Sequence, residues 1–163
     1  MTNKITPCLW FDDQAEEAAN FYVSIFANSR IGRISHYDEA GAKAAGKPVG
    51  TVMMVSFELD GQEFSGLNGG PMFKFSEATS FVVPCKTQGE IDKFWAQLSA
   101  GGSEGPCGWL KDKYGLSWQI VPEILLQLMS GKDAAAAQRV MAAVLRMKKL
   151  DIAELQQAYD RAS

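Results

Sequence analysis

The sequence predicts an α+β fold in which a unit of one strand, one helix and two or three further strands occurs twice and is followed by helices. Residues 11–25 and 84–98 align without a gap at a spacing of 73 residues, with aromatic and acidic positions matched. The turn glycines agree as well, because residues 115–119 mirror residues 61–65. After Pro122 the apolar residues change from strand spacing to helix spacing. Self-similarity of this kind indicates an internal duplication.

The first copy begins with the apolar run 5–11, which has the length of a strand. Asp12 or Asp13 is a suitable N-cap for the next helix, and Glu16 and Glu17 fall in its first turn, where negative charge suits the helix dipole. We expect this helix to run to about residue 26, followed by a strand at 31–37, a long mobile hairpin excursion at 38–50, and strands at 51–59 and 62–67. Asp60-Gly61 is a strong hairpin signal between the last two.

The second copy follows a glycine-rich break at 68–71 and a linker whose aromatic residues we expect to be partly packed. Residues 79–84 form an apolar strand, and Thr87 with Glu90 has the spacing of a capping box at the start of a helix. The apolar face of this helix carries Ile91, Phe94, Trp95 and Leu98.

The closing hairpin of the second copy, residues 108–122, is the most distinctive stretch. Gly115 is available for a positive φ in the turn. Beyond it Leu116, Trp118 and Ile120 alternate with Ser117, Gln119 and Val121, which is strand periodicity, and Pro122 removes a backbone donor at the end. Gln119 is a polar side chain on an otherwise apolar strand. It either lines a pocket or satisfies a hydrogen bond in the core.

Three helices are predicted after the hairpin, at 123–129, 134–148 and 152–161, with Asp133 and Asp151 as caps of the second and third. A stripe of apolar residues is spaced for burial, and such a stripe is typical of a core or a dimer contact. Its members are Val140, Met141, Val144, Leu145, Met147, Leu155 and Tyr159. We therefore expect one domain over 1–163, with modules at about 4–70 and 78–122 and C-terminal helices at about 123–161.

Composition excludes several classes of protein. Hydrophobic residues make up 47% of the 163 and charged residues 21%, which is typical of globular proteins. A net charge of −3 offers no basic field for nucleic acid, and the cluster of Arg146, Lys148 and Lys149 is too small to supply one. The chain has no apolar run near the ~20 residues that a membrane span needs and no signal-peptide pattern after Met1, so we expect a cytoplasmic protein without membrane partners.

The three cysteines, Cys8, Cys85 and Cys107, fit a reducing compartment because their number is odd and no C-x-x-C occurs. We interpret them as buried or half-buried small hydrophobes. The alternative is a reactive thiol in a pocket.

Four stretches together carry a family resemblance: residues 5–11, 15–22, 67–71 and 108–122. They resemble the PhnB-like branch of the vicinal oxygen chelate superfamily, often labelled 3-demethylubiquinone 3-methyltransferase-like. That superfamily also holds glyoxalase I, extradiol dioxygenases and bleomycin-resistance proteins. The resemblance covers about residues 4–160. It implies paired βαβββ modules whose mixed sheets curl into a half-barrel around a cleft, usually in a homodimer.

Enzymes of the superfamily generally hold a divalent metal on the first and last strands of each module. Carried over by residue, those positions fall on Pro7, near Ser65, and on Ser80 and Gln119. Proline has no side-chain ligand atom and serine is a weak ligand, so only Gln119 is chemically credible. The sole histidine, His36, has no acidic neighbour at ligand spacing. The resemblance therefore implies no metal here, and we expect no other cofactor.

The methyltransferase label needs a site for S-adenosylmethionine. Residues 66–71 are rich in glycine, but they precede a proline and an aromatic linker, whereas a nucleotide-binding loop opens a helix. We interpret them as a turn between modules. The sequence contains no phosphate-binding loop and no nucleophile beside a histidine base.

Two hypotheses follow. The first is a metal-free protein that binds a small, partly apolar molecule in the cleft. The second is an enzyme of lyase or dioxygenase type with an unusual ligand set, or the methyltransferase of the label. The residues expected to line the cleft, depending on which strand faces point inward, are Cys8, Trp10, Phe57, Ser65, Ser80, Trp118 and Gln119. The same aromatic residues could instead fill the core.

Overall fold

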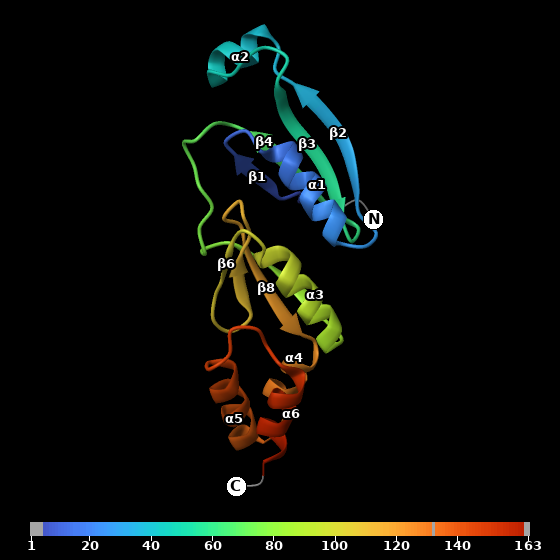
Figure 1. The fold of residues 1–163 in the computed structure, drawn as a ribbon, viewed down its shortest axis with the longest axis vertical. Coiled ribbons are helices and arrows are strands. Elements are labelled where there is room, and N and C mark those ends of the chain that lie inside the picture. The colour runs from blue at the N-terminus through green and yellow to red at the C-terminus, as the bar shows by residue number, and fades with distance from the viewer. Residues whose placement is uncertain (1–4, 132, 162–163) are drawn as a thin grey trace. The chain divides into compact units, whose positions relative to one another are not determined.

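The computed structural model describes residues 5–131 and 133–161, which fall into two compact units divided between Phe75 and Ser76 (Figure 1). The first unit contains β1 (Cys8–Phe11), α1 (Ala15–Ile25), β2 (Arg30–His36), α2 (Glu39–Ala45), β3 (Val52–Leu59) and β4 (Gln62–Asn68). The second contains β5 (Ser80–Cys85), α3 (Gln88–Ser99), β6 (Ser103–Glu104), β7 (Trp109–Lys111) and β8 (Ser117–Pro122). It ends with α4 (Ile124–Ser130), α5 (Ala134–Val144) and α6 (Ile152–Asp160).

The two sheets have the same topology, which confirms the duplication and the α+β fold. Their strand orders are β1-β4-β3-β2 and β5-β8-β7-β6. In each, the first strand pairs in parallel with the last, and the remaining pairs are antiparallel. One helix packs against each sheet, α1 on the first and α3 on the second. Each unit is therefore a mixed sheet with one face covered by a helix.

The start of α1 differs from the prediction. Gln14 holds the N-cap position without a side-chain cap, so neither Asp12 nor Asp13 caps this helix. The first free amide, Ala15 N–H, donates instead to Oδ1 of Asn68 at 2.8 Å. Asn68 is buried and lies at the end of β4, 53 residues along the chain, so a tertiary contact replaces the local cap.

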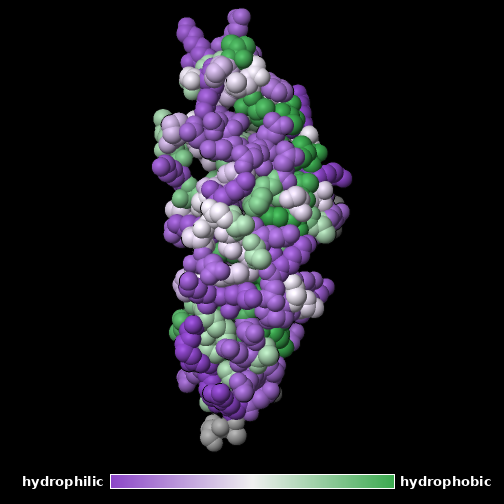
Figure 2. All heavy atoms as spheres, in the orientation of Figure 1, coloured by the Kyte–Doolittle hydropathy of each residue, from purple (hydrophilic) through white to green (hydrophobic). Residues whose placement is uncertain are grey.

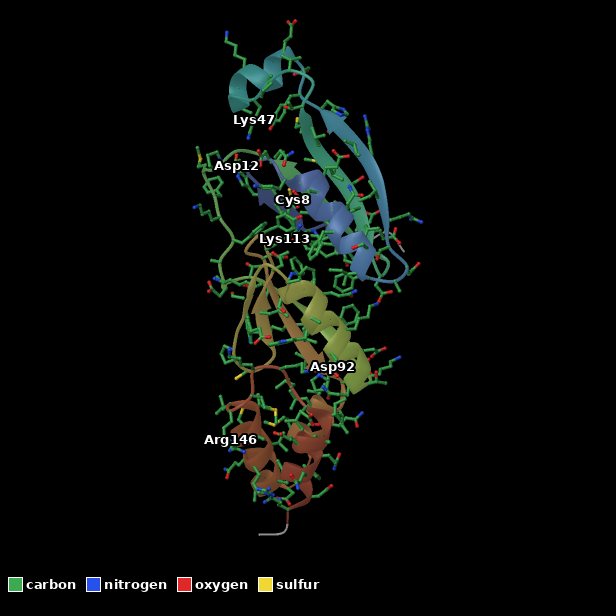
Figure 3. The ribbon with its side chains drawn as sticks, viewed as in Figure 1. Cys8, Asp12, Lys47, Asp92, Lys113 and Arg146 are labelled. Atoms are coloured by element: carbon green, nitrogen blue, oxygen red, sulfur yellow. The ribbon has the colours of Figure 1, made fainter. Side chains whose placement is uncertain are left out.

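The segment predicted as a mobile hairpin excursion contains a helix. Asp38 caps α2 by accepting from Gly41 N–H, and Gly46 ends it with a left-handed φ of 66°. Lys47, labelled with Asp12 in Figure 3, then donates to the Asp12 carbonyl at 2.8 Å and to its carboxylate at 3.1 Å. The prediction was wrong because short alanine-rich segments form helices when caps and tertiary contacts hold both ends.

The turns and the second helix follow the sequence closely. Asp60 and Gly61 both have positive φ, at 46° and 81°, as the tight hairpin between β3 and β4 requires. Thr87 and Glu90 form the predicted capping box of α3. Gly115 has a φ of 87° in the hairpin between β7 and β8.

Asp112 organises that hairpin from inside. Only 2% of the residue is exposed, and its carboxylate accepts hydrogen bonds from the amides of Tyr114 and Leu116 and from the indole of Trp118, at 2.9, 3.0 and 2.9 Å. A buried carboxylate is stable only when its oxygens are hydrogen-bonded. Asp112 therefore ties the turn to the strand that follows it.

The C-terminal helices form a small core of their own, built on Leu128, Val140, Ala143, Val144, Leu150 and Leu155. Asp133 and Asp151 cap α5 and α6 as predicted. However, α5 ends at Val144 and not near Lys148, and Met141 and Leu145 are 42% and 66% exposed, so they are not part of the buried stripe. Figure 2 shows scattered apolar groups on the surface of its lower part.

The helical segment is tied to the second sheet through backbone contacts. Cys107 N–H donates to the Met147 carbonyl at 2.8 Å, and Gly108 N–H donates to the Lys148 carbonyl at 2.7 Å. On α3, Asp92 pairs with Lys149 (Asp92 is labelled in Figure 3). No helix in residues 5–131 and 133–161 is long and apolar enough to span a membrane.

Candidate functional site

Each sheet has one face covered by its helix and one face open within its own unit. In the second unit Trp118 and Ile120 of β8 are buried beneath α3, with 3% and 0% exposed, whereas Gln119 and Val121 between them are partly exposed. In the first unit Val55, Phe57 and Leu59 are buried on the α1 side. Strand alternation therefore separates the candidate residues into core residues and open-face residues.

Two of the predicted cleft residues belong to the core. The Phe57 ring is stacked on Phe64 at a centroid distance of 5.4 Å and lies 6.2 Å from the Tyr22 ring of α1. Trp118 lies 5.7 Å from the Phe81 ring and donates to Asp112. Both residues face the covering helix, because each occupies the strand position that alternation assigns to the core.

The remaining candidates lie on the open faces. In the first sheet Cys8 pairs in register with Ser65, and the Trp10 indole donates to the Gly70 carbonyl at 2.8 Å. Cys8, labelled in Figure 3, is exposed, contrary to the expectation of a buried or half-buried thiol. The open face of this sheet also borders a pocket of about 290 Å³ formed by residues of β2, β3 and β4 together with Thr6.

Gln119 and Ser80 meet on the open face of the second sheet. The Gln119 side-chain amide donates to the Ser80 hydroxyl at 2.8 Å, across the parallel pair of β8 and β5. Both residues are only partly buried. The pair thus supplies a polar, partly exposed feature on a face that also carries Val82, 57% exposed.

A pocket of about 460 Å³ lies at the other edge of this sheet. Its lining comes from the segment before β5, from β6 and β7, from the connection between them, and from the first residue of β8. The residues are Glu77, Ser103, Gly105, Pro106, Cys107, Trp109, Leu110, Lys111 and Ser117. Trp109 and Gln119 are partners in the β7–β8 register, so the pocket adjoins the Gln119–Ser80 pair. This volume lies within the range of ordinary small-molecule sites.

Sequence reasoning missed the pocket. Trp109, Lys111 and Ser117 were visible as parts of the hairpin, but their common face depends on the pairing register, which places Lys111 opposite Ser117. Glu77 reaches them from 34 residues before Lys111 and forms an ion pair with it at 2.5 Å. No sequence signal marks such a long-range pair.

Comparison with known proteins assigns the chain to a protein family. Residues 3–121 match the family described as 3-demethylubiquinone-9 3-methyltransferase. The chain belongs to this family. The PhnB protein from Bacillus cereus is 40% identical, with a TM-score of 0.64 over 74% of this chain and 99% of that one.

More distant structures share the fold of this 3-demethylubiquinone-9 3-methyltransferase family member. A protein from Pseudomonas aeruginosa is 15% identical, with a TM-score of 0.59 over 75% of this chain and 98% of that one. The fosfomycin resistance protein FosX from Listeria monocytogenes is 13% identical, with a TM-score of 0.53 over 78% and 96%. These likenesses concern the fold. No curated protein matches the chain in sequence.

The residues of this family member do not fit the metal of the superfamily's enzymes. The positions that the resemblance assigns are Pro7, one near Ser65, Ser80 and Gln119, and the Gln119 amide is bonded to Ser80. Among the residues that the structure describes, no three His, Cys, Asp or Glu side chains form a group able to hold a metal ion. Amide and hydroxyl groups without a charged ligand form a weak site for a divalent cation.

The glycine-rich segment of this family member is explained by a tryptophan. A Cβ on Gly69 would lie 2.2 Å from the Trp10 ring, so glycine is needed for the indole to pack there and reach the Gly70 carbonyl. The segment follows β4 and leads into turns, without a helix before β5. The geometry agrees with a turn after the first sheet and not with a loop that binds a nucleotide at a helix N-terminus.

Proposed function

We propose that this protein binds a small, partly apolar molecule on the open face of its second sheet and does so without a catalytic metal. The observation that supports this most is the hydrogen-bonded pair Gln119–Ser80 next to a pocket of about 460 Å³. Ligand sites combine apolar walls with a few polar groups, and Trp109, Pro106 and Cys107 supply apolar surface here. The metal-free state is proposed from the chemistry of the ligand positions, which offer no charged donor.

A thermal-shift screen of purified protein tests the proposal. The library contains small aromatic compounds, antibiotics and S-adenosylmethionine. A bound compound raises Tm because it stabilises the folded state by mass action, and at a ligand concentration a hundredfold above Kd the free energy of unfolding rises by about 2.7 kcal/mol. We expect at least one partly apolar compound to raise Tm, and Gln119→Leu to remove the shift. Gln127→Leu on the exposed side of α4 is the matched control and leaves the shift intact.

Two results contradict the proposal. One is a stoichiometric divalent ion that remains through chelation, measured by elemental analysis of the purified protein. The other is methyl transfer from S-adenosylmethionine to a demethylated quinone, which would show that this chain has the activity that the family's description names. A shift that survives Gln119→Leu places the ligand away from the Gln119–Ser80 pair.

The proposal includes a homodimer in the cytoplasm. The cysteines support a reducing compartment, because Cys8, Cys85 and Cys107 are all free. Light scattering after size-exclusion chromatography gives the mass directly, and a value near twice 17.8 kDa is expected.

A further inference from the structure

We propose that the pocket beside β7 takes an organic anion with an apolar body, and that the anionic group replaces Glu77 as the partner of Lys111. The inference rests on the proposed function, which it deepens by naming the class of ligand and the residues that select it. It follows from an ion pair at the pocket, a buried hydroxyl next to it, and the chemistry of the walls.

The ion pair between Lys111 and Glu77 already places a carboxylate in this pocket. The Lys111 ammonium lies 2.5 Å from Glu77 Oε1, and both residues line the cavity. Lys111 hydrogen bonding is the main reason that the pKa of the Glu77 carboxyl is below its usual value. The Lys111 ammonium therefore binds a carboxylate at this position in the free protein.

The same ion pair is easily exchanged. The side chain of Glu77 is 64% exposed and that of Lys111 is 37% exposed, and pairs in contact with water contribute little to stability. Glu77 lies on the segment before β5, outside any helix or strand, whereas Lys111 lies on β7 with both neighbouring strands paired to it. A ligand carboxylate can therefore replace Glu77 while the strand keeps Lys111 in place.

Ser117 supplies a second polar group at the same place. It stands directly opposite Lys111 in the β7–β8 register and lines the pocket, yet the residue is fully buried. Its hydroxyl has no hydrogen-bond partner among the described residues. A buried hydroxyl without a partner is unfavourable, so a ligand oxygen that accepts from Ser117 and from Lys111 satisfies both donors.

The walls define the rest of the ligand. Pro106, Cys107 and Trp109 surround the cavity with apolar and aromatic surface, and its volume of about 460 Å³ accommodates a fused bicyclic compound with room for substituents. A cationic ligand is the less favoured class, because its ammonium would have to replace Lys111, the less exposed and strand-held member of the ion pair.

Three probes of one shape test the charge preference by isothermal titration calorimetry. They are 2-naphthoate, 2-naphthamide and 2-(aminomethyl)naphthalene. We expect naphthoate to bind at least tenfold more tightly than the other two. Lys111→Gln should remove this difference, and Glu77→Gln should tighten naphthoate binding several-fold because the competing carboxylate is gone. Ser117→Ala should weaken naphthoate binding about tenfold. Its unfolding transition serves as the check that this variant is still folded.

Lys148→Gln and Asp92→Asn are the matched controls. Each removes one charge from another ion pair of the same unit, Lys148–Glu104 and Lys149–Asp92, and neither should change naphthoate affinity by more than twofold. A change as large as that of Lys111→Gln would show a general charge effect and overturn the inference.

Three further outcomes overturn the inference without contradicting the proposed function. Equal affinity for the three probes, or weaker naphthoate binding in Glu77→Gln, refutes the exchange at Lys111 while binding of a small molecule still stands. Absence of binding by all three probes also refutes the ligand class. The proposed function itself fails on separate results: the bound divalent ion or the methyl transfer described above, or a wider thermal-shift screen that finds no compound whose effect depends on Gln119.

Discussion

Replacement of Asp112 by asparagine should destabilise the protein strongly, although the two side chains are nearly equal in size and shape. The carboxylate accepts from two backbone amides through Oδ1 and from the Trp118 indole through Oδ2, all at 2.9 or 3.0 Å. Asparagine keeps one oxygen, and its NH₂ group must then face either the indole N–H or the two amides. Facing the indole is the less costly arrangement.

The magnitude follows from the bonds that are lost. A hydrogen bond to a charged group contributes about 1.5–3 kcal/mol, and the two bonds that remain become weaker because their acceptor is neutral. We therefore expect Asp112→Asn to lower the free energy of unfolding by about 3 kcal/mol. Urea unfolding at pH 7 measures this as a shift of the midpoint with an unchanged m-value.

A double-mutant cycle with Trp118→Phe isolates the indole contact. Phenylalanine removes the N–H that conflicts with the asparagine NH₂, so the double variant should be more stable than the sum of the single effects predicts, by about 2 kcal/mol. Trp95→Phe is the control, because its indole donates to Glu104 and shares no partner with Asp112. If the Asp112–Trp118 cycle is as additive as the Asp112–Trp95 cycle, the carboxylate does not act through Trp118 and the reasoning is refuted.

Two further predictions concern backbone strain and alkaline pH. Gly108→Ala should lower the free energy of unfolding in urea by about 2–3 kcal/mol, because φ is +82° and the new Cβ would lie 2.7 Å from the Ile120 carbonyl oxygen and 3.2 Å from Leu150 Cδ1. Gly115→Ala is the control, since Gly115 has a similar φ but open space around it, and it should cost only about 1 kcal/mol. Equal losses for the two variants would refute the role of the contact. Burial raises the pKa of the Cys85 thiol from 9.0 to about 11, so the folded state keeps a proton that the unfolded state has released. Stability from this thiol is complete below pH 9 and is lost between pH 9 and 11; Cys85→Ala should flatten the decline in that window, and an unchanged slope would contradict the assignment.

Much of the fold could be predicted because its signals are local. The capping box of Thr87 and Glu90, the turn at Asp60 and Gly61, and the positive φ at Gly115 each depend on residues within a few positions of one another. The duplication was visible because both copies keep the same apolar spacing. The errors fell where a distant group decides the outcome, as with the Asn68 side chain that takes the place of a local cap at Ala15.

The site was less accessible to sequence reasoning. Gln119 stood out as a polar side chain on an apolar strand, and the structure places it on an open face with Ser80 as its partner. Phe57 and Trp118 were chosen for their aromatic character, but the helix-covered face of a sheet uses the same residue types as a ligand pocket. Burial, which the sequence does not contain, is what distinguishes the two.

The sequence by itself determined that this protein has two related sheet-and-helix units and a helical C-terminal segment. Those properties follow from residue identity and short-range spacing. Only the tertiary structure decided which face of each strand is open, that Lys111 stands opposite Ser117, and that Glu77 pairs with Lys111, 34 positions further along the chain. The physical reason is that strand register and long-range ion pairs depend on how separate segments meet, and period-two alternation alone cannot say which face the helix covers.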